Sequence, residues 1–223
     1  MKKGWKLVMS VLLWGALWGI TEATVGCVLH LLPLKAYGWL FWYPIAFFFM
    51  DRAYRSTGSS AAILAVAALS AGIKMLNLLL PIRVDMVLNP SISILLEGLA
   101  LFVGLTVVRR VPGKLWQKGL FALGINTGWR VLYLLYILCM PQWMIDISAL
   151  RGWGPFLEFM AVQNLLTSCI LVGLMLIPVG QGKLARAARD WVGRSRFQGK
   201  EALLQAGGVA LALALNIVLQ FTL

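Results

Sequence analysis

Residues 59–80 read SSAAILAVAALSAGIKMLNLLL, an almost unbroken apolar run whose one charged side chain is Lys74. A bilayer core about 30 Å thick is crossed by about 20 helical residues. Continuous apolar sequence favours a helix over a membrane β-strand, because a barrel strand alternates apolar and polar side chains. This run therefore predicts one membrane-spanning helix.

Comparable runs recur along the chain, separated by short charged or Pro- and Gly-rich breaks. We therefore predict an all-α, polytopic transmembrane bundle of about seven spans, with six helices in the core and a seventh at the C-terminus. The predicted spans are 6–31, 37–51, 59–80, 90–108, 117–139, 155–178 and 202–222. Because 37–51 is short, aromatic and interrupted by Pro44, a half-helix or re-entrant segment stays open there.

The composition agrees with lipid as the surrounding solvent. Of the 223 residues, 61% are hydrophobic and 13% are charged, and the mean hydropathy is +0.84. Soluble domains are nearer half apolar and a quarter charged. These values exclude an ordinary soluble globule, a disordered chain and a disulfide scaffold.

The net charge of +12 is distributed unevenly over the predicted loops. With Met1 in the cytoplasm, three basic residues lie outside: Lys35, Arg83 and Arg151. Fifteen lie inside: Lys2, Lys3, Lys6, Arg52, Arg55, Arg109, Arg110, Lys114, Lys118, Lys183, Arg186, Arg189, Arg194, Arg196 and Lys200. This asymmetry predicts an inner-membrane protein with a cytoplasmic N-terminus and an external C-terminus. We therefore interpret the charge as a topology signal and expect no nucleic-acid partner.

The predicted organisation has three parts. Residues 1–180 form the transmembrane helical core, 181–200 form a basic cytoplasmic segment, and 201–223 form the C-terminal transmembrane helix. In the basic segment Leu184, Ala188 and Trp191 share one helical face, which favours a helix lying on anionic membrane lipids. Docking of a cytoplasmic partner is the alternative.

Polar side chains inside the spans are the candidate functional residues, because charges at bilayer depth are costly and commonly functional. Given the predicted topology, Glu22, Lys74, Glu97 and Arg130 all lie near the middle or in the outer half. We expect two ion pairs, Lys74 with Glu97 and Arg130 with Glu22. The predicted ligand-binding set is Glu22, His30, Lys74, Asn77, Glu97, Asn126, Arg130 and Tyr133.

Two interpretations of this set stay open. The residues line a polar pocket that opens to the outside, or they form buried ion pairs that fix how the helices pack. A ligand of mixed charge, or one with a polar ring stacked on Tyr133 or Trp129, suits the pocket.

Other chemistry has little support. The chain has one histidine, and the HExxH, GxSxG and P-loop motifs are absent, so we predict no catalytic residue, metal site or cofactor. An intramembrane enzyme acting on a lipid or isoprenoid, with the same carboxylates as acid or base, is an alternative. A scaffold that associates through Gly15 and Gly19 of a GxxxG motif is another.

The pattern resembles the substrate-binding S components of energy-coupling factor transporters. The resemblance rests on chain size, on the outer polar residues, on the small residues Gly15, Gly19 and Ala23, and on the segments TEATVGCVLHLLP (21–33), IKMLNLLLP (73–81) and NPSISILLEG (89–98). It departs from that family in having seven predicted spans instead of six, and glycines where alanines are usual.

The resemblance implies a pocket near the outer surface, no nucleotide site, and a transmembrane coupling protein with ATPases as partners. The leading hypothesis is thus a membrane solute-binding or transport subunit that captures a small polar or vitamin-like molecule, with membrane lipids around it.

Overall fold

The computed structural model describes residues 3–31, 35–79, 81, 83–141 and 148–177, together with Gly207, Ala210, Leu211 and Ala214. Its description of side chains leaves out Lys3, Lys6, Ser148 and residues 23–31 and 35–37. Within these ranges the secondary structure is helical, with no strand. This confirms the all-α prediction.

Five long or medium helices come first: α1 (Lys3–Leu31), α2 (Trp42–Thr57), α3 (Ala61–Met75), α4 (Val84–Val108) and α5 (Leu115–Cys139). The last apolar segment is made of α6 (Trp153–Leu157), a π-helical turn η4 (Glu158–Val162) and α7 (Gln163–Leu176). Short 3-10 helices join the longer elements: η1 (Lys35–Leu40), η2 (Leu76–Leu79) and η3 (Ser148–Leu150).

Four helical segments are long and apolar enough to cross a membrane. They are Ala61–Leu79, Val84–Val108, Leu115–Cys139 and Trp153–Leu176, and they coincide with the predicted spans 59–80, 90–108, 117–139 and 155–178. Many of their large apolar side chains are exposed, among them Leu79, Val107 and Leu138, as lipid contact requires. In the described part of the chain, four helical segments thus have the length and composition of membrane spans, which is consistent with a membrane protein.

The other predicted spans have different outcomes. The first coincides with α1. Within the described residues the apolar part of this helix is Leu7–Glu22, which is shorter than the four segments above. The second is replaced by α2, whose 16 residues reach only about 24 Å at 1.5 Å each. Of span 202–222 and the basic segment 181–200, only four helical residues lie within the described part, so both predictions stand outside it.

Neither Pro44 nor Pro90 interrupts a helix. Pro44 lies in the first turn of α2, where a backbone N–H has no intrahelical partner to lose. The predicted boundary at residue 90 is wrong, because α4 begins at Val84 and contains Pro90 in its interior. Next to it, the Ser91 hydroxyl donates to the Val87 carbonyl over 2.7 Å, a side-chain bond that helps membrane helices tolerate proline.

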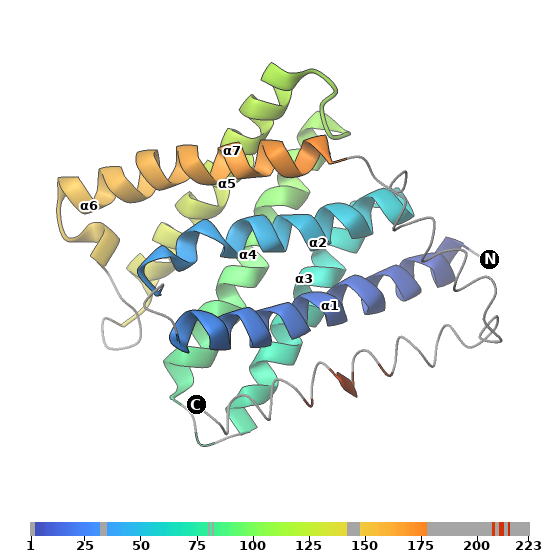
Figure 1. Ribbon diagram of the computed structural model, residues 1–223, viewed down its shortest axis with the longest axis horizontal. Helices are drawn as coiled ribbons and strands as arrows, with labels where there is room; N and C mark the ends of the chain where they lie inside the picture. Colours follow the sequence, from blue (N-terminus) through green and yellow to red (C-terminus); the bar gives the residue numbers. More distant parts are fainter. Residues whose placement is uncertain are drawn as a thin grey trace.

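The helices form two layers that cross each other (Figure 1). In this view α1, α2 and α7 lie side by side in front, and α3, α4 and α5 cross behind them. The central helix of the front layer, α2, packs against α1 and α7 beside it and against α3 and α4 behind it. The short second segment is therefore the middle of the fold.

Small residues on α1 allow close packing against α3. A Cβ added to Gly15 would lie 2.6 Å from Leu69 Cδ2, and one added to Gly19 would lie 3.0 Å from Ile73 Cδ1. The Ser70 hydroxyl donates to the Gly15 carbonyl over 3.1 Å. The GxxxG motif is thus used inside the bundle, as small residues commonly are in membrane helix pairs.

Two glycines of α4 have the same function at its other contacts. A Cβ on Gly98 would lie 2.6 Å from the Cβ of Ala67 on α3, and one on Gly104 would overlap Ile125 Cγ2 on α5. At Gly98 the atom met is the Cβ of Ala67, which cannot turn away, so a side chain there requires α3 and α4 to move apart. The glycines therefore fix the separation within the rear layer.

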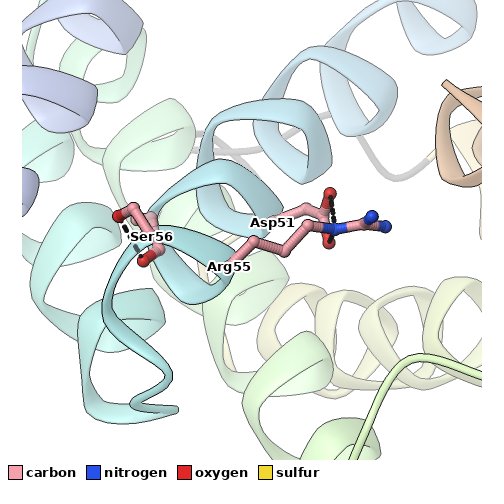
Figure 2. A network of polar contacts seen from close by, with 4 residues as sticks. Asp51, Arg55 and Ser56 are labelled. Atoms are coloured by element: carbon pink, nitrogen blue, oxygen red, sulfur yellow. Dashed lines mark hydrogen bonds and ion pairs between the residues drawn. The ribbon is translucent and has the colours of Figure 1, made fainter. Parts of the chain in front are cut away.

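One end of the bundle gathers polar contacts around the last turns of α2 (Figure 2). Arg55 Nε donates to the Asp51 carboxylate over 2.8 Å, within the same helix. The Ser56 hydroxyl forms a hydrogen bond with the Ser10 hydroxyl of α1. The N-terminal half of α1 thus lies beside the C-terminal end of α2.

The C-terminal end of α4 reaches the same place, because the Tyr54 hydroxyl of α2 donates to the Arg109 carbonyl over 3.5 Å. Arg52 lies over the Phe48 ring, with its guanidinium carbon 4.9 Å from the centroid. We call this the basic end of the bundle, defined by Arg52, Arg55 and Arg109.

Candidate functional site

Side chains from both layers converge between the helices. We call the following five residues the polar cluster: Glu22 on α1, Tyr43 on α2, Lys74 on α3, Glu97 on α4 and Arg130 on α5. Each comes from a different helix, so the bundle has to be assembled before the cluster exists.

The four charges of the cluster form a chain of electrostatic neighbours. Glu22 interacts with Lys74 and with Glu97, and Glu97 interacts with Arg130. The sequence prediction placed Lys74 with Glu97 and Arg130 with Glu22. The structure brings the four residues together, but neither of the two expected pairs is among these interactions.

These charges are neighbours without direct ion pairing. Between described residues, the ion pairs within 4.0 Å are Arg55–Asp51 and Arg83–Asp85, both outside the polar cluster. Glu97 is 4% exposed and accepts one long hydrogen bond of 3.5 Å from the Ser93 hydroxyl. A buried carboxylate ordinarily has closer partners than this.

Arg130 is the most unusual member of the cluster. Its side chain is fully buried at 0% exposure, yet none of its three guanidinium nitrogens has a hydrogen-bond partner in the described part of the chain. The Tyr43 hydroxyl, at 1% exposure, also has none. Buried charged groups without partners are costly and rare in native proteins. Within the described part of the chain, both groups are therefore buried donors whose hydrogen bonds are unmet.

Aromatic rings hold the guanidinium in place. The carbon Cζ of Arg130 lies 4.5 Å from the Phe159 ring centroid and 5.2 Å from that of Trp129. Tyr43 packs on the same Trp129 ring at 5.6 Å between centroids. Cation–π contacts of this kind stabilise a cation without using its N–H groups. Among the described residues, the guanidinium of Arg130 thus has ring contacts but no hydrogen-bond acceptor.

Phe159 owes its position to the π-helical turn. Within η4 the Gln163 N–H bonds to the Glu158 carbonyl, five residues earlier. A π turn inserts one extra residue into a helix and often occurs at functional sites. Here the turn carries Phe159, whose ring contacts Trp129 and Tyr133 as well as Arg130. No pattern in the sequence marks this turn.

Asn126 supports the cluster from the side. Its Nδ2 donates to the Asn164 carbonyl over 2.8 Å and to the Ser168 hydroxyl over 3.1 Å, and its Oδ1 accepts from Trp129 Nε1 over 2.8 Å. Both amide hydrogens are therefore used, so the side chain joins α5 to α7 and orients the Trp129 ring. Its predicted contact with a ligand stays a prediction.

The remaining predicted residues are placed as follows. Asn77 is fully buried in η2. Tyr133 is half-buried, with its ring 5.7 Å from that of Trp129. His30 belongs to the last turn of α1, and its side chain lies outside the described residues. Sequence reasoning missed Tyr43 and Phe159, since an aromatic residue in an apolar run carries no signal of its own.

The cluster lies away from the basic end. Glu97 precedes Arg109 by twelve residues on α4, and Glu22 follows Ser10 by twelve on α1, so each lies about 18 Å along its helix from that end. The two carboxylates therefore share one depth in the bundle.

Comparison of the chain with protein-family models, with curated proteins and with solved structures gives no match.

Proposed function

We propose that this protein is a membrane solute-binding subunit of a transport system, and that the polar cluster is its binding site. The observation that carries the proposal is the buried Arg130 guanidinium, which has aromatic contacts but no hydrogen-bond partner among the described residues. A purely structural arginine would be expected to pair with Glu97 or a backbone carbonyl, because the unmet donors of a buried charge cost free energy. A bound solute supplies the missing partner.

The finer topology belongs to the same proposal. The fifteen-to-three distribution of basic residues supports seven spans, a cytoplasmic N-terminus and an external C-terminus. With that orientation the basic end faces the cytoplasm, and the polar cluster lies toward the outer face. A solute would then enter from outside.

Transport needs an energy source, and the sequence contains no P-loop motif for binding a nucleotide. The resemblance to energy-coupling factor S components supports a transmembrane coupling protein and ATPases as partners. Because the Gly15–Gly19 face is already occupied by α3, such a partner would contact other surfaces of the bundle.

Thermal unfolding of the full-length protein in lipid nanodiscs tests the proposal. We screen vitamins, amino acids, nucleobases and organic acids at 1 mM and follow tryptophan fluorescence. At least one compound class is expected to raise Tm, since a ligand that binds only the folded state stabilises it. The double variant E97Q/R130M, which removes both charges, should lose the shift.

Two results would count against the proposal. If no compound of any class changes Tm, the cluster is a structural feature only. If soluble compounds fail but an isoprenoid or lipid binds and is chemically converted, the intramembrane-enzyme alternative gains support instead.

A further inference from the structure

The hydrogen-bonding groups of the Arg130 guanidinium limit the chemical class of the proposed solute. The guanidinium carries five N–H donors in a planar fork and no acceptor. All three of its nitrogens are buried and without partners in the described ranges. A planar fork of this kind matches the two oxygens of a carboxylate or the oxygens of a phosphate.

A second donor lies beside it. The Tyr43 hydroxyl is buried, has no partner among described residues and packs on the same Trp129 ring as Arg130. Tyr43 and Arg130 are also electrostatic neighbours. A hydroxyl and a guanidinium together offer donors to an anionic oxygen group and little to a cation.

The surroundings agree with an anion held in place. Phe159 and Trp129 contact the guanidinium through their rings, and an aromatic ring is a much weaker hydrogen-bond acceptor than an oxyanion. Asn126 accepts a hydrogen bond from the Trp129 indole N–H, which orients one of the two rings that contact the guanidinium. Glu97 interacts with Arg130 electrostatically, and no ion pair joins these two described residues within 4.0 Å.

We propose that the solute carries a carboxylate or phosphate group, and that this group binds between the Arg130 guanidinium and the Tyr43 hydroxyl. The inference rests on the proposed function and names the chemical class of its ligand. Glu97, whose charge acts on Arg130, then favours a hydrogen-bond donor or a positive charge elsewhere on the solute.

The experiment compares acids with their neutral amides on the wild-type protein in nanodiscs. The probes are benzoate with benzamide, phenylacetate with phenylacetamide, and glutamate with glutamine, with phenyl phosphate as the phosphate probe. Binding is followed by the rise of Tm with probe concentration. At least one acid is expected to bind about 30-fold or more tightly than its amide, as a buried charge-assisted contact requires.

Variants locate the effect. R130M and R130K should weaken acid binding about 30-fold or more, because methionine lacks the charge and lysine lacks the fork. Y43F should weaken it by up to about 10-fold, the size of one neutral hydrogen bond. R83M is the matched control and should bind as wild type, because the Arg83 side chain is 68% exposed and pairs with Asp85 elsewhere.

An oxyanion could also come from a lipid headgroup. A second arm therefore adds phosphatidic acid to phosphatidylcholine nanodiscs without any soluble probe. A rise in Tm that depends on Arg130 in this arm, with none from soluble acids, would overturn a soluble solute as the source. The expected result is a response to soluble acids and none to the lipid that depends on Arg130.

The outcomes separate the two proposals. The oxyanion inference would be overturned if the amides bound as tightly as the acids. It would also be overturned if neutral or cationic solutes bound and R130K bound them as tightly as the wild type does. Either result would leave solute binding itself standing. A protein that responds to no solute of any class overturns both. The comparison of acid with amide needs no variant, so poor folding of R130M cannot obscure it.

Discussion

Replacing Glu97 by Gln is expected to destabilise the protein by about 3 kcal/mol, and replacing Arg130 by Met should have an effect of similar size. Glu97 is 4% exposed and Arg130 is 0% exposed, and each acts electrostatically on the other, so each substitution removes an opposite charge that favours the buried charge that remains. The double variant E97Q/R130M removes both charges and should recover most of the loss. Reversible unfolding in SDS measures the free energy of unfolding of the wild type and of each variant.

The same cycle on other pairs provides the controls. K74M combined with E22Q should also show recovery, since Lys74 and Glu22 are electrostatic neighbours. K74M combined with E97Q should be nearly additive. R83M and D85N each remove one partner of the Arg83–Asp85 ion pair. Each should lower the free energy of unfolding by less than about 1 kcal/mol, because exposed ion pairs contribute little to stability. Recovery in K74M/E97Q, with none in E97Q/R130M, would restore the pairing expected from the sequence.

The second large effect concerns the close approach of α3 and α4. Replacing Gly98 by Leu is expected to lower the free energy of unfolding by about 3 kcal/mol or more. A Cβ at this position would already lie 2.6 Å from the Ala67 Cβ. The helices would have to separate, and Glu97, the adjacent residue, would move with them. A loss of both Tm and solute binding is the expected readout in thermal unfolding and binding assays.

A compensating change makes this prediction specific. G98A alone should destabilise the protein, and A67G in the same chain should restore part of the loss by removing the methyl group that clashes. Gly124 is the matched control in α5, since nothing lies within 4 Å of a Cβ added there. G124A should be neutral or slightly stabilising. If G98A is as harmless as G124A, the packing described for α3 and α4 is incorrect.

Much of the fold follows from local sequence. Long apolar runs are enough to predict α3, α4, α5 and the 153–176 segment, because lipid requires the backbone to satisfy itself within one helix. Pro90 misled the boundary of α4, since a proline inside a membrane helix looks like a helix start. The small residues at Gly15 and Gly19 predicted close packing, but only the structure shows that α3 is the neighbour.

Local sequence also predicts part of the candidate site. Helical periodicity placed Arg130 and Asn126 on one face, and the cost of buried charge singled out Glu22, Lys74 and Glu97. Which charges become neighbours depends on how the two layers cross, and that is a tertiary property. Phe159 depends on a π turn, and Tyr43 on the central place of α2, neither of which any spacing reveals.

Mass spectrometry of small molecules released from the purified wild-type protein tests the central claim most directly, which is that the polar cluster holds a solute. The protein is denatured after gentle purification, and the E97Q/R130M variant is treated in parallel. We predict that an organic molecule bearing a carboxylate or phosphate is released from the wild type and is depleted in the variant. Equal release from both, or release of none from either, would contradict the claim.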